Sequence, residues 1–119
     1  MAKEKILDNK VMAFIESVGG WRVKYWAGSP YTKSGVPDIL ACINGEFYGI
    51  EDKDVKGKPT LLQLRTLQRI RVSGGIGILL YPGDFENFKS FVLYRDESAT
   101  NWYIKNIAMQ KKIFEDMQK

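Results

Sequence analysis

Two acidic residues and a lysine are spaced so that a β-hairpin would gather them at one end. Asn44 and Gly45 separate two short apolar runs, and this pair is typical of a two-residue type I′ turn, because both turn residues take positive φ. With that turn, Asp38 lies directly opposite Glu51, with Cβ atoms about 4.5–5.5 Å apart on one side of the sheet. Lys53 projects from the same side, because strand side chains alternate.

This arrangement indicates a metal site. Two like charges that face each other are destabilising unless something compensates them. A hard divalent cation compensates both, since Mg²⁺ prefers oxygen ligands and keeps several waters. Lys53 would then lie beside a metal-bound water or a substrate phosphate. The pattern predicts metal-assisted hydrolysis of a phosphodiester.

Length and composition narrow the protein class. The 119 residues suit one domain, 1–119, and 45% hydrophobic with 27% charged residues is typical of a soluble globular protein. No apolar run approaches the roughly 18 residues of a membrane span, and the N-terminus does not resemble a signal peptide. The lone Cys42 excludes an internal disulfide and a cysteine-cluster zinc site, and is expected to be a small buried residue. A cytoplasmic protein is expected.

The chain has no histidine. This excludes Ser-His-Asp and Cys-His catalysis, His-ligated zinc and nucleases whose general base is an imidazole. Hydrolytic chemistry must therefore use carboxylates, lysine and metal. The net charge of +4 favours an anionic partner, nucleic acid being the commonest, although it is also compatible with plain solubility.

Hydrophobic spacing predicts an α/β fold around a mixed sheet. The first expected elements are a helix at about 3–18 and a half-buried strand over 21–26, in which aromatic and basic residues alternate. The hairpin follows, and then a helix opened by Pro59 or Thr60. The last elements are a fully buried strand over 76–81, parallel to the second hairpin strand, and a short helix over 85–91. The core is expected over about 5–93. Residues 101–119 have helical spacing but are expected to extend outside the compact unit.

One acid of the first helix has two interpretations. Asp8 lies at the edge of the apolar stripe of that helix. It could be an acid favoured by the helix dipole near the N-terminus, or a third acid that points toward the metal site.

Several polar residues flank the predicted site. Lys33 and Ser34 lie in the loop before Asp38, where they are either solvated or in contact with phosphate. Lys56 and Lys58 lie in the polar turn after the hairpin. Gln63, in the first turn of the next helix, would point back toward the open end of the hairpin. The arginines of that helix, Arg65, Arg69 and Arg71, are expected mainly to solvate its surface.

These residues carry a resemblance to a known family. Pro37-Asp38 followed by Glu51-Asp52-Lys53 resembles the PD-(D/E)xK nuclease signature. The form GVPDIL…GIEDK, followed by GKPTLLQ, resembles its VRR-Nuc branch, the virus-type replication–repair nucleases. The similarity covers about residues 5–81 and implies a restriction-endonuclease-like core.

The resemblance implies an Mg²⁺- or Mn²⁺-dependent DNA endonuclease, often a homodimer, that acts on branched DNA such as four-way (Holliday) junctions. Small members occur as stand-alone phage and bacterial domains, which implies a bacterial or phage-infected cell. By position, Asp38, Glu51 and the backbone carbonyl of Asp52 match metal ligands, Lys53 matches the catalytic lysine, Gln63 matches a family glutamine, and Asp8 falls where the family has a glutamate.

Asp52 departs from the family pattern, in which the residue between Glu51 and Lys53 is usually apolar. Burial of an unpaired carboxylate there would lower the free energy of unfolding by several kcal/mol, as it does for other buried, unpaired charges. Asp52 is therefore expected to be exposed, paired with a lysine or arginine, or turned toward the metal. Two other functions stay open: an inactive DNA-binding module with the same fold, and an interaction protein whose acids and lysine form a satisfied ion network.

Overall fold

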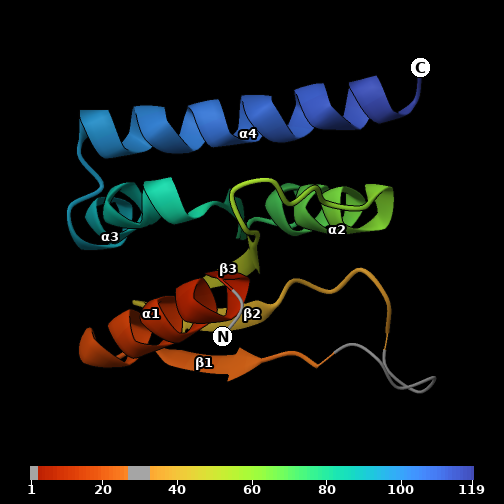
Figure 1. Cartoon of the computed structure of the whole chain (residues 1–119). Helices are drawn as coiled ribbons and strands as arrows, with labels where there is room; N and C mark the ends of the chain where they lie inside the picture. Colours follow the sequence, from red (N-terminus) through yellow and green to blue (C-terminus); the bar gives the residue numbers. More distant parts are fainter. Residues whose placement is uncertain (1–2, 27–32) are drawn as a thin grey trace.

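The computed structural model describes residues 3–26 and 33–119, which form a four-stranded mixed sheet packed between helices (Figure 1). Strands β1, β2 and β3 are antiparallel neighbours, and β4 pairs with β3 in parallel. This confirms the predicted α/β fold with a mixed sheet. The elements are α1 (Lys3–Ser17), β1 (Trp21–Lys24), β2 (Ile39–Ile43), β3 (Glu46–Asp52), α2 (Leu61–Val72), β4 (Ile76–Leu80), the 3₁₀ turn η1 (Pro82–Asp84), α3 (Phe85–Leu93) and α4 (Glu97–Met117).

The β2–β3 hairpin has the predicted turn and register. Asn44 and Gly45 have φ of 52° and 78°, as a type I′ turn requires. Ile43 pairs with Glu46, and the ladder continues to Ile39 opposite Ile50. The next pair along this register is Asp38 and Glu51, at the open end of the hairpin.

The sheet has two differently covered faces. On the first, which we call the α1 face, helices α1 and α3 pack on the apolar side chains of the sheet, and the core there includes Leu7, Val11, Ile50, Ile78 and Phe88. On the second, the α2 face, a smaller cluster of Leu64, Leu67 and Leu79 joins α2 and β4 to α4. Alternation along β3 therefore places Glu51 on the α2 face and Asp52 on the α1 face.

Helix α2 begins beside the site and lies close to the sheet. Thr60 caps it, as predicted. A Cβ added to Gly77 would lie 2.7 Å from the carbonyl oxygen of Leu67, so only glycine lets the backbone of α2 approach β4 this closely.

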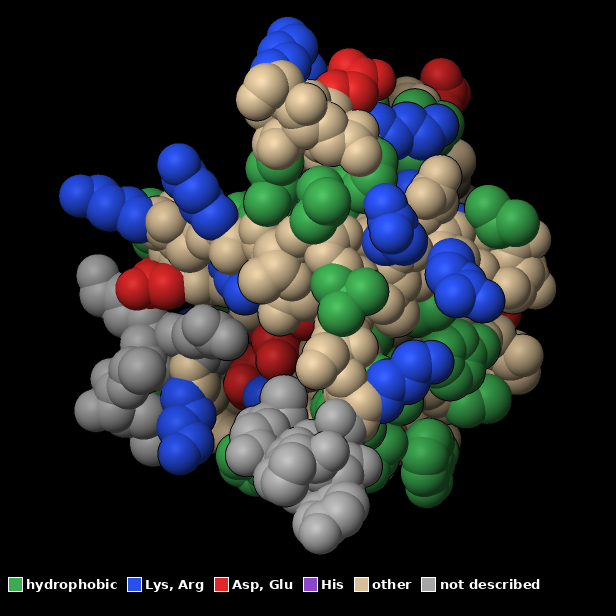
Figure 2. Space-filling model, turned by 90° about the vertical axis from the view of Figure 1, so that its right-hand side faces the viewer, with side chains coloured by type: hydrophobic (Ala, Val, Ile, Leu, Met, Phe, Trp, Pro, Cys, Tyr) green, Lys and Arg blue, Asp and Glu red, His purple; other side chains and the backbone are tan. Residues whose placement is uncertain are grey.

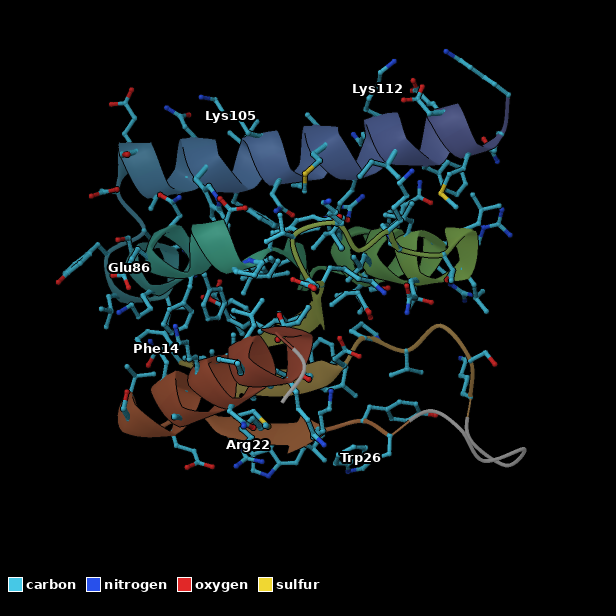
Figure 3. The ribbon with its side chains drawn as sticks, viewed as in Figure 1. Phe14, Arg22, Trp26, Glu86, Lys105 and Lys112 are labelled. Carbon is cyan, nitrogen blue, oxygen red and sulfur yellow. The ribbon has the colours of Figure 1, made fainter. Side chains whose placement is uncertain are left out.

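Helix α4 corrects one expectation. It begins at Glu97 rather than at residue 101, and it packs on β4, α2 and α3 instead of extending outside the compact unit (Figure 1). Asn106 and Gln110 are buried against β4, whereas Lys105 and Lys112 project from its outer side (Figure 3). Among the described residues, no helix is long and apolar enough to cross a membrane.

Strand β1 buries its basic side more than its aromatic side. Trp21 and Val23 are exposed, while Arg22 and Lys24 are partly buried. Cys42, the register partner of Trp21, is also exposed, so the expectation of a buried cysteine was wrong. The physical reason is that the described helices on the α2 face pack over β3 and β4 and leave this part of β1 and β2 uncovered.

Candidate active site

The backbone holds Asp38 firmly at the open end of the hairpin. Its carbonyl accepts a hydrogen bond from the backbone N–H of Tyr25 (2.8 Å), which extends the pairing of β1 with β2. Its Oδ2 accepts another from the backbone N–H of Asp52 (3.0 Å). The carboxylate is therefore fixed beside β3, next to Glu51.

Glu51 is 1% exposed, and neither of its carboxylate oxygens has a hydrogen-bond partner of good geometry among the described residues. Lys53 Nζ lies 3.3 Å from Oε2. Burial and the charge of Asp38 raise the pKa of Glu51 to about 8, against the opposing charge of Lys53. Burial also raises the pKa of Asp38, partly offset by Lys24. The predicted convergence of Asp38, Glu51 and Lys53 is therefore present.

These donors fit a hard divalent cation. The carboxylates of Asp38 and Glu51 face each other, and the Glu51 oxygens are buried without partners. Within the described part of the chain, no cluster of three or more Asp, Glu, His or Cys side chains could hold a metal. Mg²⁺ commonly binds through one or two carboxylates and keeps several waters, so two acids suffice. The expected third ligand, the carbonyl of Asp52, stays a prediction.

Asp8 belongs to a second, adjacent cluster. Its Oδ2 accepts a hydrogen bond from Lys24 Nζ at 2.6 Å, and the same Nζ lies 3.8 Å from Asp38 Oδ1. Asp8 is buried, and its other oxygen has no hydrogen-bond partner among the described residues. The structure thus pairs Asp8 with Lys24 on the α1 face, and its role as a metal ligand stays a prediction.

Asp52 lies in this second cluster, 0% exposed, and its carboxylate oxygens have no hydrogen-bond partner among the described residues. The expectation of an exposed Asp52 is therefore excluded. Burial raises the pKa of Asp52 well above the ordinary aspartate value. The Asp8 carboxyl raises this pKa further, through its charge and as a hydrogen-bond partner of protonated Asp52. The positive charge of Lys24 opposes this rise in the pKa of Asp52, although the ion pairs of Lys24 among the described residues are with Asp8 and Asp38.

Sequence reasoning missed Lys24, which links the two clusters. Burial acts to lower its pKa, but the hydrogen bond to Asp8 and the charges of Asp38, Asp8 and Asp52 raise it above the ordinary value. Lys24 therefore stays protonated between three acids. The alternation of basic and aromatic residues in β1 was the available signal, because it places Lys24 on the same face as Asp52.

The Gln63 side chain forms part of the N-terminal cap of α2. Its Oε1 accepts the backbone N–H of Thr60 (2.9 Å), and its own N–H donates to Thr60 Oγ1 (3.1 Å), which completes a capping box. Only its amide Nε2 remains to act toward the site, so its catalytic role stays a prediction.

The predicted DNA-binding residues lie on both sides of the acids. Lys33 and Ser34 line a groove of about 430 Å³ beside α2, and Lys56 and Lys58 line a hollow of about 670 Å³ beside α4. Figure 2 shows acidic atoms in a recess with Lys and Arg side chains around it. Residues 27–32 of the loop before Lys33 lie outside the described residues. Contact of any of these residues with DNA stays a prediction.

Comparisons with known proteins support the predicted relationship. No protein-family model matches this chain, and no curated protein does. A solved structure described as "VRR_NUC domain" is similar to it, with a TM-score of 0.62 and 26% sequence identity over 81% of this chain and 100% of that chain. Together with the motif and its register, this likeness supports the predicted VRR-Nuc relationship.

Proposed function

We propose that this protein is a divalent-metal-dependent DNA endonuclease that hydrolyses phosphodiester bonds. The likeness to a VRR_NUC domain supports a nuclease-type function. The observation that carries the proposal is the facing pair Asp38 and Glu51 on one side of the sheet, with Lys53 Nζ 3.3 Å from Glu51 Oε2. Two acids and a lysine on adjacent strands suit phosphoryl chemistry better than a structural ion pair, because the Glu51 carboxylate is buried with unfilled acceptors.

Asp38 and Glu51, with the carbonyl of Asp52, would hold Mg²⁺ or Mn²⁺. When bound, such a cation lowers the pKa of a water ligand and neutralises charge on phosphoryl oxygens. The backbone N–H of Asp52 orients the Asp38 carboxylate through Oδ2. Lys53 presents a fixed positive charge beside Glu51, where it stabilises charge that develops on the phosphate. Gln63 would orient water through its Nε2, which forms no hydrogen bond within the described part of the chain.

The substrate we propose is DNA, and branched DNA in particular, such as a four-way junction. Lys33, Lys56 and Lys58 would contact backbone phosphates, which gives salt-dependent affinity without sequence readout. Each chain carries one site, so paired cuts across a symmetric junction would need two copies related by a two-fold axis. A homodimer is therefore part of the proposal.

A cleavage assay tests this function. Labelled four-way junction, flap and linear duplex are incubated with Mg²⁺, Mn²⁺ or EDTA, and Asp38→Ala is compared with the wild type. Glu86→Ala is the matched control, because Glu86 is an exposed acid on α3, away from the hairpin (Figure 3). We expect metal-dependent cutting that is lost in Asp38→Ala and kept in Glu86→Ala.

The alternative is an inactive DNA-binding module, and the buried Asp52 is the observation that favours it. Tight junction binding by folded wild-type protein, with no cutting under either metal, would support that alternative and contradict the endonuclease.

A further inference from the structure

The uncovered part of the α2 face carries a row of exposed side chains. In the sheet register, Trp21 pairs with Cys42, and Cys42 pairs with Phe47. Trp21 is 62% exposed and Phe47 is 45% exposed, while Cys42 between them is exposed as well. Adjacent strands lie about 4.8 Å apart, so the two rings are separated by roughly 10 Å across three strands.

This row leads into the groove beside α2. Phe47 is part of the groove lining, together with Lys33, Arg65 and Arg69. No acidic residue lines the groove, and within the described part of the chain none of the three basic residues forms an ion pair. The groove is therefore a cationic channel with an aromatic platform at its side.

The row and the candidate site share one face of the sheet. Alternation places Asp38 and Cys42 on the α2 face of β2, and Phe47 and Glu51 on the same face of β3. Four residues of strand span about 13 Å, so the groove lies within a few nucleotides of the acids. Hydrophobic and basic side chains also lie together on the right-hand side of Figure 2, beside the acidic recess.

We propose that the Trp21–Cys42–Phe47 row and the adjoining groove bind an unpaired strand of nucleic acid, with bases stacked on Trp21 and Phe47 and phosphates at Arg65 and Arg69. The substrate of the site would then carry a single-stranded segment, a refinement that rests on the proposed function. Exposed rings recognise unpaired bases, because bases in a duplex already stack on one another and present only their edges.

The charge of the groove decides between possible occupants. A second copy of this chain, docked about a two-fold axis, would bring two cationic grooves together, and like charges across an interface oppose association. A strand of nucleic acid has the complementary charge along its whole length and an aromatic face on every base.

Binding is measured in EDTA by fluorescence anisotropy, with a labelled oligo-dT strand and a duplex of the same length. The test variant is Trp21→Thr/Phe47→Thr, which keeps β-forming residues on both strands. The matched control is Trp26→Thr, since Trp26 is 67% exposed but lies beside Lys24 at the end of β1. Circular dichroism checks that each variant is folded.

We expect wild type and Trp26→Thr to bind oligo-dT more tightly than duplex. The double variant should bind oligo-dT about tenfold more weakly or worse, in line with the loss of base stacking. Arg65→Gln/Arg69→Gln should reduce the slope of log affinity against log salt by about 0.7 for each phosphate that the variant no longer neutralises.

Three results would overturn the inference: tighter binding of duplex than of oligo-dT by wild type, equal oligo-dT affinity of wild type and Trp21→Thr/Phe47→Thr, or a wild-type dimer that this variant converts to monomer. Because EDTA removes divalent metal, the binding result is independent of cleavage. Loss of the proposed endonuclease would show in the cleavage assay instead, with oligo-dT binding unchanged.

Discussion

Asn106 of α4 forms two hydrogen bonds with the backbone of Leu79, and these replace the two that a neighbouring strand would form. Its Nδ2 donates to the Leu79 carbonyl (2.8 Å), and its Oδ1 accepts the Leu79 N–H (3.1 Å). Gln110 Nε2 donates to the carbonyl of Gly77 (3.0 Å), and the Tyr103 hydroxyl accepts the Gly77 N–H (3.1 Å). Helix α4 therefore closes the β4 edge of the sheet, which would otherwise invite pairing with another chain.

Asn106→Leu should destabilise the fold. The substitution leaves the N–H and the carbonyl of Leu79 buried without partners, and each unsatisfied buried group costs about 1–3 kcal/mol. Urea denaturation followed by circular dichroism should show a lower free energy of unfolding than in the wild type. Lys105→Leu is the matched control, because the neighbouring Lys105 projects into solvent. Equal stability of Asn106→Leu and Lys105→Leu would contradict the role of Asn106.

Local signals were enough to predict the hairpin and the start of α2. Asn44 and Gly45 determine the turn and hence the pairing of β2 with β3, and Thr60 with Gln63 forms the cap that begins α2. Each of these depends on residues that are close in sequence. The convergence of Asp38, Glu51 and Lys53 follows from the hairpin alone.

The rest depends on contacts between distant segments, which periodicity does not encode. Cys42 was expected to be buried as a small apolar residue of the first hairpin strand, but α2 covers β3 and β4 instead of β1 and β2. The packing of α4 was missed in part because the buried amides of Asn106 and Gln110 attach it to β4, and hydrophobic spacing does not reveal such contacts. Lys24 was missed because its partner Asp8 is on a different element.

Lys24→Met should be among the most destabilising single substitutions. It would leave Asp8 buried without its cation, and removal of one partner from a buried ion pair costs about 3–5 kcal/mol. Thermal unfolding compares it with Arg22→Met on the same strand, because the partner of Arg22, Glu16, is exposed. Adding Asp8→Leu to Lys24→Met should recover part of the loss. A double variant no more stable than Lys24→Met would argue against the pair.

Asp52→Asn should stabilise the protein at neutral pH. The folded-state pKa of Asp52 is raised by burial and by Asp8, so ionisation of Asp52 opposes folding as the pH rises from the ordinary aspartate pKa toward the raised one. Below that window both forms are neutral and the difference disappears. Melting temperatures of wild type and Asp52→Asn at pH 3.5 and pH 8, roughly on either side of the ordinary aspartate pKa, should therefore differ only at the higher pH. A wild type that is more stable than Asp52→Asn at pH 8 would contradict this assignment.

Lys53→Ala should abolish cleavage and leave DNA binding largely intact. Its ammonium lies beside Glu51, and in the proposed mechanism it acts on the reacting phosphate rather than on the distant DNA backbone. Cleavage rate and binding affinity are measured on the same junction, with Lys105→Ala as the control, because Lys105 projects from the outer side of α4. Turnover that is unchanged in Lys53→Ala would exclude its catalytic role.

Divalent metal should stabilise the folded protein through Asp38 and Glu51. A cation that binds only the folded state raises the melting temperature with its concentration, because binding adds to the free energy of unfolding. Here it also relieves the repulsion between two facing carboxylates, one of them buried with unfilled oxygens. We expect Mn²⁺ to raise the melting temperature of the wild type, and to have little effect on Glu51→Gln. Glu16→Gln, an exposed acid on α1, should respond like the wild type. A wild type whose melting temperature is indifferent to Mn²⁺ and Mg²⁺ would support a satisfied ion network at this end of the hairpin, and would contradict a metal site there.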